Sequence, residues 1–218
     1  MTYAITILNK SGVDLARFVQ FHNKFYRISN IKGTCYDKNG NLIKKVKRKE
    51  FLDIPAISGY SLYEDTRAVI YDPNLNDFPF TVEYQYTYDF NGFLNYPSWT
   101  LYEDYNVAVE YKKLKIQIPS NMDFRTYNQN FNKDATISEA DSYKIFEWQV
   151  MDLPALQEEP LSPELSNLTK AIFIAPEKFK LDGIEGDMSS WNSFGDWIYQ
   201  LNNERDVLNE EAKLRIKD

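Results

Sequence analysis

The segment of residues 78–90 (FPFTVEYQYTYDF) constrains the fold more than any other part of the chain. Its even-numbered residues are all aromatic or β-branched, whereas its odd-numbered residues are polar apart from Pro79. A period of two residues is the pattern of a β-strand with one buried face. At about 3.4 Å per residue the strand would be on the order of 40 Å long, so several other segments must cover its apolar face. We therefore predict a protein that is mainly β.

Further strand-like segments surround this one on both sides. The clearest turn between two of them is Asp37-Lys38-Asn39-Gly40, because an Asn-Gly pair accepts the positive φ that a tight hairpin needs. A change in the parity of the apolar residues predicts a bulge or a break at Lys112-Lys113. We expect strands over residues 3–8, 28–37, 41–46, 68–71, 107–118, 142–150 and 170–175, a polar hairpin over 126–138, and loops over 51–63 and 179–186.

One segment near the C-terminus has the period of a helix instead. Apolar residues recur there at spacings of three and four, and Ser189 or Ser190 can cap the helix N-terminus. We expect this helix to form the junction with a further domain, and we expect a second helix over residues 208–217. The residues of the apolar stripe are Trp191, Phe194, Trp197, Ile198 and Leu201.

The 218 residues suffice for one large domain or two small ones. Several prolines and glutamates between residues 152 and 168 are typical of an extended, charged connection. We therefore expect a β-sandwich module over residues 1–151, an extended linker with a late strand over 152–188, and the helical start of a following domain over 189–218. Because the sequence opens inside a strand pattern, we expect it to be part of a longer polypeptide.

Charge and hydropathy exclude some classes of function. The net charge is −7, and an acidic total argues against nucleic acid as the main partner, since phosphate binding needs clustered basic residues. No apolar run approaches the roughly 18 residues of a membrane helix, and no leader pattern follows Met1. The single cysteine, Cys35, cannot form an internal disulfide, so it does not indicate a cellular compartment.

The sharpest catalytic hypothesis is a Cys35 nucleophile activated by His22, with Asp37 nearby. We favour a small buried side chain for Cys35, because it lies in a strand pattern beside a hairpin. With one histidine and one cysteine, a zinc site is almost excluded, and a calcium loop that begins at Asp37 lacks its closing acid because position 48 is Arg48. We predict no catalytic residues, no metal and no cofactor, and hence no enzyme activity in this chain.

Two groups of residues are candidates for binding. The basic run of residues 44–49 could bind an anionic partner, although lysines that protect a strand edge from pairing are the commoner arrangement. Aromatic residues outside the alternating strands could stack on sugar rings, although aromatic residues of a sandwich core are commoner. These residues are Tyr60, Tyr63, Tyr96, Trp99, Tyr102 and Tyr105.

The order of several short motifs resembles a known family. The motifs are residues 5–12, 28–33, 36–40 and 80–86, followed by Phe146-Glu147-Trp148, residues 153–156 with Glu159, and residues 191–197 with Leu201. They are similar to a bacterial domain of unknown function that precedes a transglutaminase-like cysteine-protease domain in longer proteins. The resemblance implies an immunoglobulin-like β-sandwich, export to the periplasm or cell surface, and a catalytic Cys, His and Asp beyond Asp218.

From this resemblance we expect a non-catalytic leading module that positions substrate or a partner for the downstream transglutaminase-like domain of the same protein. The alternative is an independent carbohydrate-binding β-sandwich module, which the loop aromatic residues would serve. A cysteine hydrolase that uses Cys35 ranks third. A protein or a glycan is the expected partner in either of the first two cases.

Overall fold

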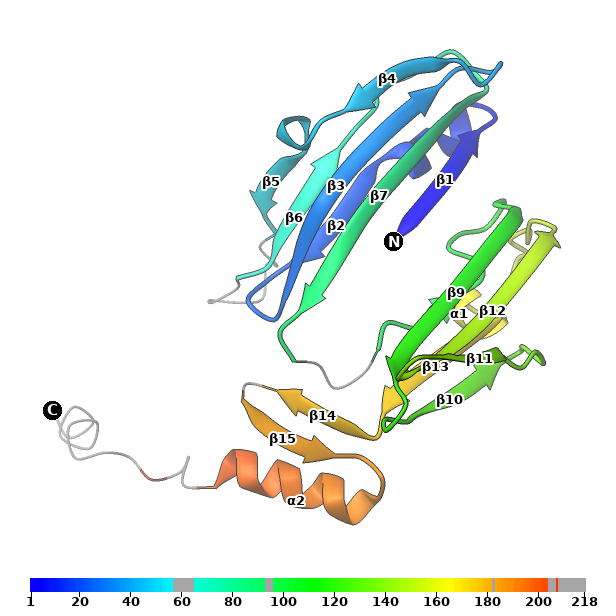
Figure 1. Cartoon of the computed structure of the whole chain (residues 1–218). Coiled ribbons are helices and arrows are strands. Elements are labelled where there is room, and N and C mark those ends of the chain that lie inside the picture. Colours follow the sequence, from blue (N-terminus) through cyan, green and yellow to red (C-terminus); the bar gives the residue numbers. More distant parts are fainter. Residues whose placement is uncertain (57–64, 93–95, 182, 204–206, 208–218) are drawn as a thin grey trace, which may run out of the picture. The chain divides into compact units, whose positions relative to one another are not determined.

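The computed structural model describes residues 1–56, 65–92, 96–181, 183–203 and 207 (Figure 1). Backbone contacts divide the chain into two compact units, Met1–Gly92 and Phe93–Asp218, which are described separately below. Both units are built from antiparallel sheets, and a helix follows the last strand. The predicted fold class, mainly β with a short C-terminal helix, is confirmed. None of the described helices is long and apolar enough to cross a membrane.

The first unit is a sandwich of two antiparallel sheets. One sheet has the strand order β1-β7-β3-β4 and the other has the order β2-β6-β5. In Figure 1 the long strand β7 lies between β1 and β3. The strands are β1 (Thr2–Ile7), β2 (Phe18–His22), β3 (Tyr26–Tyr36), β4 (Leu42–Val46), β5 (Leu52–Pro55), β6 (Arg67–Tyr71) and β7 (Phe80–Phe90), with short 3-10 helices η1 (Lys10–Ala16) and η2 (Arg48–Glu50).

The core of this unit lies under the alternating residues of β7. Phe80, Val82 and Tyr84 are each at most 1% exposed, and they pack in one cluster with Phe18 of β2 and Val69 of β6. The two sheets therefore share a single core, as an immunoglobulin-like sandwich requires. The strand predicted from the period of two is confirmed over Phe80–Phe90, and its even-numbered residues up to Tyr88 pack in or against the core, while Phe90 is 41% exposed.

The outer face of the sheet β2-β6-β5 is also apolar. Val19 and Phe21 on β2 and Leu52 and Ile54 on β5 are all more than 40% exposed. Strand β5 lies where a loop is predicted over residues 51–63, so that prediction is wrong for its first part, while 57–64 lie outside the described residues. Pro55 ends β5, an edge strand, where its missing N–H does not interrupt a ladder.

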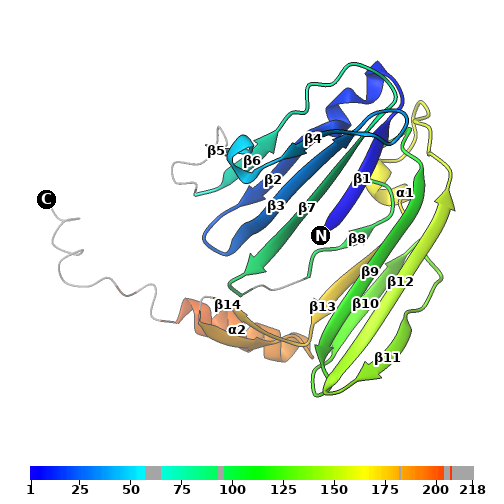
Figure 2. The same cartoon turned by 45° about the horizontal axis from the view of Figure 1, so that its top comes forward.

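The second unit contains two three-stranded sheets and a two-stranded hairpin, with the orders β10-β13-β8, β11-β12-β9 and β14-β15. Figure 2 shows β9 and β12 side by side. The core of the unit joins the first two sheets through Trp99, Trp148 and Ile172. The elements are β8 (Trp99–Thr100), β9 (Val109–Pro119), β10 (Phe124–Gln129), β11 (Thr136–Ala140), β12 (Tyr143–Leu153), α1 (Leu165–Leu168), β13 (Ala171–Pro176), β14 (Lys178–Leu181), β15 (Ile184–Asp187) and α2 (Trp191–Asn202).

Two predicted features of this unit are wrong. Strand β9 pairs with β12 in one unbroken register, from Pro119 opposite Tyr143 to Tyr111 opposite Met151, so there is no bulge at Lys112-Lys113. Tyr111 faces solvent, 53% exposed, whereas Val109 and Leu114 both pack against the core of the unit. Residues 126–138 do not form a hairpin, since β10 pairs with β13 and β11 pairs with β12.

The units do not follow the boundaries expected from the sequence. The structure divides the chain after Gly92, whereas the sequence favours one module over residues 1–151 and a linker over 152–188. Strand β13 lies inside that expected linker, yet it is the central strand of the sheet β10-β13-β8. Residues on both sides of position 151 therefore build one sheet, which local composition does not reveal.

Candidate functional site

Cys35 lies on β3 and is 1% exposed, within the core of the first unit. Burial raises the pKa of its thiol, with the nearby Lys44 opposing that effect. A thiol whose pKa is raised is a poor nucleophile. His22, on the other sheet, directs Nε2 to Asp53 Oδ1 at 3.2 Å. The structure thus gives Cys35 the buried environment predicted for it and provides His22 with a different partner.

Asp53 joins His22 to Arg67, whose Nε lies 2.7 Å from the same carboxylate oxygen. Burial raises the pKa of the Asp53 carboxyl, but hydrogen bonds from Arg67 and His22 outweigh burial and hold the pKa below its usual range. No nucleophile contacts this cluster in the described part of the chain, so it is an ion-pair network and not a catalytic triad.

The Asp53 network is expected to make stability depend on pH in the acidic range. A lowered pKa means that the folded state binds the proton less tightly than the unfolded state, so the contribution is present above about pH 4 and is lost as pH falls through the folded pKa. Asp53→Asn should therefore narrow the difference between urea midpoints measured at about pH 6 and about pH 2.5. Asp77→Asn is the control, and an equal narrowing in both variants would contradict the assignment.

Asp37 belongs to the turn between β3 and β4 and not to a calcium loop. Its carboxylate accepts hydrogen bonds from the backbone N–H groups of Asn39 and Asn41, each at 2.8 Å. These bonds, with the Asn41 side chain as the largest cause, lower the pKa of the Asp37 carboxyl. Gly40 has a φ of 80°, as the predicted turn requires. Among the described residues, no group of His, Cys, Asp and Glu is arranged to hold a metal ion.

The basic run of residues 44–49 follows an edge strand. Strand β4 is at one end of its sheet, and Lys44 forms an ion pair with Glu50 at 2.6 Å. Arg48 donates to the carbonyl of Phe51 at 3.1 Å. The structure therefore favours lysines that protect a strand edge over an anion-binding surface.

Of the aromatic residues proposed for sugar stacking, two of the four that the structure describes are buried. Trp99 and Tyr102 are each 7% exposed and belong to the core of the second unit. Tyr96 packs against that core, and the Tyr105 hydroxyl donates to the carbonyl of Pro163 at 3.3 Å. Tyr60 and Tyr63 lie outside the described residues. A sugar platform built on Trp99 and Tyr102 is therefore wrong, because the core buries both side chains.

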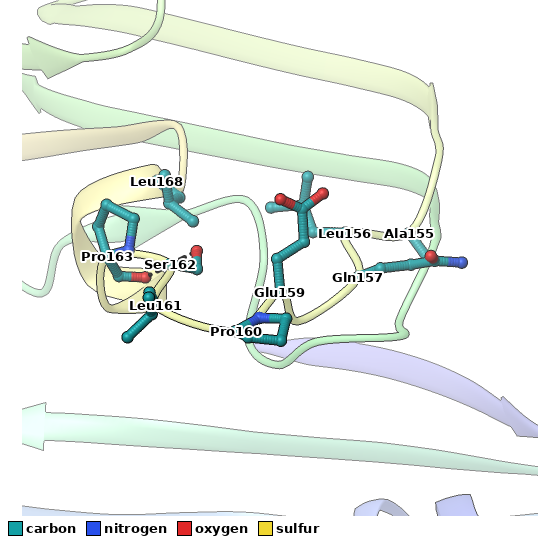
Figure 3. A pocket seen from close by; sticks show the side chains of 9 residues that line it. All are labelled: Ala155, Leu156, Gln157, Glu159, Pro160, Leu161, Ser162, Pro163 and Leu168. Carbon is teal, nitrogen blue, oxygen red and sulfur yellow. Dashed lines mark hydrogen bonds between the residues drawn. The ribbon is translucent and has the colours of Figure 1, made fainter.

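A shallow hollow lies along the loop that joins β12 to α1 (Figure 3). Its volume is about 550 Å³. Glu159 is the charged residue among those that line it, and its side chain is exposed. A lone exposed carboxylate has no partner for acid–base chemistry, so the hollow does not define a reaction. The lining residues are Ala155, Leu156, Gln157, Glu159, Pro160, Leu161, Ser162, Pro163 and Leu168.

The hairpin β14-β15 and helix α2 form a small core of their own. Trp197 is 3% exposed, and its ring meets the Phe179 ring at a centroid distance of 4.8 Å. Phe194 stacks on Trp197 at 5.7 Å. Gly186 allows this contact, because a Cβ there would lie 2.3 Å from the Phe179 ring. The loop predicted over residues 179–186 is therefore wrong, since two strands pair there.

The predicted start of α2 is confirmed. The Ser190 side chain accepts a hydrogen bond from the backbone N–H of Ser193 at 3.1 Å, which makes Ser190 the N-cap. Of the predicted apolar stripe, Phe194 and Trp197 face the hairpin, and Leu201 is half-buried. The predicted second helix over residues 208–217 lies outside the described residues.

A second apolar side of α2 remains exposed. Trp191 is 88% exposed, Ile198 41% and Tyr199 72%. At 100° per residue, Trp191 and Ile198 lie on the same side of the helix, two turns apart, beside the stripe that packs on the hairpin. The apolar surface of α2 is therefore wider than the two strands cover. We name Trp191, Ile198 and Tyr199 the α2 surface.

These features define a class of protein: a β-rich module of two units, whose described residues bring no catalytic set together. The chain belongs to the family described as a domain of unknown function with solved-structure structure, DUF3857, whose model matches residues 1–157. The resemblance to a domain of unknown function is thereby confirmed. The matched region ends after β12, so β13, the hairpin and α2 lie beyond it.

A solved structure has a similar fold. It is a crystal structure of a putative protease from Parabacteroides distasonis, with a TM-score of 0.66 at 15% sequence identity. The match covers 80% of this chain and 35% of the other, so the chain spans about a third of the length of that protein. At this identity the similarity shows the fold alone. No curated relative matches the chain.

Proposed function

We propose that this chain is the non-catalytic leading module of a transglutaminase-like protein and that it positions a substrate or partner for a catalytic domain beyond Asp218. The observation that carries the proposal is the α2 surface, where Trp191 is 88% exposed and where Ile198 and Tyr199 on the same helix are 41% and 72% exposed. Several large, exposed apolar side chains on one short helix are typical of a surface that another protein part covers. We assign the downstream domain as the part that covers the α2 surface.

The position of α2 in the chain supports this assignment. The family model ends at residue 157, and the hairpin-helix core begins at Lys178, so α2 follows the family domain. A two-stranded hairpin is marginally stable by itself, and a neighbouring domain would stabilise it. The similar solved structure is described as a putative protease, and this chain spans 35% of it.

The burial of Cys35 supports a non-catalytic role. This cysteine is 1% exposed, and burial raises its thiol pKa. The catalytic cysteine of the proposed protein would then belong to the downstream domain. By the same resemblance we propose a periplasmic or cell-surface location, which fractionation of the source cells would test.

The coding sequence beyond Asp218 gives the most direct test. The proposal expects an open reading frame that continues into a helix with a cysteine, followed by a histidine and an aspartate. A stop codon directly after Asp218 would contradict it.

A second test asks whether the α2 surface contacts that domain. Trp191→Ala should lower the melting temperature of the full-length protein but change the free energy of unfolding of this chain alone by no more than about 0.5 kcal/mol, since an exposed side chain contributes little until it is covered. Tyr127→Ala, at a residue that is 66% exposed on β10, is the matched control. An equal effect of Trp191→Ala with and without the downstream domain would refute the contact.

A further inference from the structure

The four-stranded sheet of the first unit has two edges of different character. Its order is β1-β7-β3-β4, so β1 and β4 are the edge strands. Strand β1 pairs with β7 on one side, and no strand among the described residues pairs with its other side. A free strand edge offers a row of backbone donors and acceptors to another strand.

The register shows which groups of β1 face the free edge. Met1 and Tyr86 exchange two backbone bonds, Met1 N to Tyr86 O at 2.6 Å and Tyr86 N to Met1 O at 2.9 Å. Because bonded pairs alternate along an antiparallel ladder, Tyr3 and Ile5 also direct their backbone groups to β7. The residues between them are Thr2, Ala4 and Thr6. Their backbone N–H and C=O groups point away from β7, toward the free edge.

Only one of the two edges carries charges that prevent pairing. Strand β4 contains Lys44 and Lys45, and lysines on an edge oppose the approach of another strand. Strand β1 has the sequence TYAITI, with no charge and no proline. Its β-branched and aromatic residues favour pairing.

We propose that β1 pairs antiparallel with β1 of a second copy of this chain. A two-fold axis beside Ala4 places Ala4 opposite its own counterpart and Tyr3 opposite Ile5, so that apolar side chains of both copies lie on the core side. No like charges meet in this register, because the strand has none. The dimer would extend each four-stranded sheet into a continuous sheet of both copies.

The lysines of β4 determine where this assembly stops. After β1 has paired with its counterpart, both outer edges of the joined sheet are β4 strands. Further copies would have to approach Lys44 and Lys45, so the sheet closes as a dimer and does not grow into a fibre. This inference does not depend on the function proposed for α2.

Sedimentation velocity on this chain of 218 residues, with any affinity tag at the C-terminus, tests the proposal. A pair of six-residue strands makes a small interface, so we expect the dimer fraction to rise between about 1 and about 100 µM. Ala4→Lys places two like charges opposite each other, and Ala4→Pro removes an outward N–H while the bonds of Tyr3 and Ile5 to β7 remain. Both variants should be monomeric over this range.

Ser138→Lys is the matched control, because it adds a lysine to β11, an edge strand of the other unit. It should dimerise as the parent does. Circular dichroism melts of all four proteins identify any variant that is unfolded. If one Ala4 variant is unfolded, the oligomeric state of the other Ala4 variant tests the proposal. A parent that stays monomeric throughout, or an Ala4→Lys variant that is folded and still dimeric, would overturn the proposal.

Discussion

Replacing Tyr84 with alanine is expected to lower the free energy of unfolding of the first unit by about 3 to 5 kcal/mol, the range for large buried aromatic residues. Tyr84 is 0% exposed, and its ring contacts the rings of Phe18 and Tyr3 at centroid distances of 5.2 and 5.5 Å. Its hydroxyl donates to the carbonyl of Ala16 at 2.8 Å. The substitution would leave a cavity between the two sheets of the sandwich, because Tyr84 and Phe18 belong to different sheets.

Hydrogen exchange of peptides from β3 and β7, measured by mass spectrometry in increasing urea, would report the loss. Tyr84→Phe keeps the ring and leaves the Ala16 carbonyl unpaired, so it should cost about 1 to 3 kcal/mol. Tyr127→Ala, at a residue 66% exposed, should stay within about 0.5 kcal/mol of the parent. Equal exchange of the β3 and β7 peptides in Tyr84→Ala and in the parent would contradict the prediction.

The second large effect is expected from Trp197→Ala, which should release α2 from the hairpin β14-β15. Trp197 is 3% exposed and contacts both Phe179 and Phe194, which are the other aromatic residues of this small core. A loss of about 3 to 5 kcal/mol exceeds what a two-stranded hairpin and one short helix can retain. The two sheets of the second unit have a separate core and should remain folded.

Exchange rates of the amides of α2, compared with those of β9 and β12, would separate these outcomes. In Trp197→Ala the amides of α2 should exchange faster, while the exchange rates of β9 and β12 should change little. Trp191→Ala is the internal control, since Trp191 is on the same helix but 88% exposed. Faster exchange of β9 and β12 in Trp197→Ala would show that the hairpin-helix core is not independent.

The sequence predicts elements whose signals are local. The alternation of Phe80, Val82 and Tyr84 identifies β7 and its buried face, because one side chain in two must face the core. Gly40 identifies the turn after β3, and Ser190 identifies the start of α2, because each position needs a particular backbone or side-chain geometry. These predictions depend on few neighbours.

Features that depend on distant partners are not predicted. Strand β13 becomes the centre of a sheet through pairing with residues 52 and 73 positions earlier in the chain, as in Phe124 opposite Pro176 (176 − 124) and Trp99 opposite Ile172 (172 − 99). The exposed pair of Tyr127 and Phe173 on β10 and β13 is missed for the same reason. The hairpin β14-β15 did have a local signal, since Asp182-Gly183 is a turn dipeptide and Gly183 has a φ of 85°.

The order of strands within the sheets has a consequence for synthesis on the ribosome. In the first unit β7 is the last of the described strands, yet it lies between β1 and β3. In the second unit β13 is made after β8 and β10, and it lies between them. Neither sheet can be completed by the strands that emerge first, because its central strand emerges last. In the first unit, β1 and the β3-β4 pair therefore cannot join into one sheet until about residue 90 has been made. In the second unit, β8 and β10 cannot join until about residue 176 has been made.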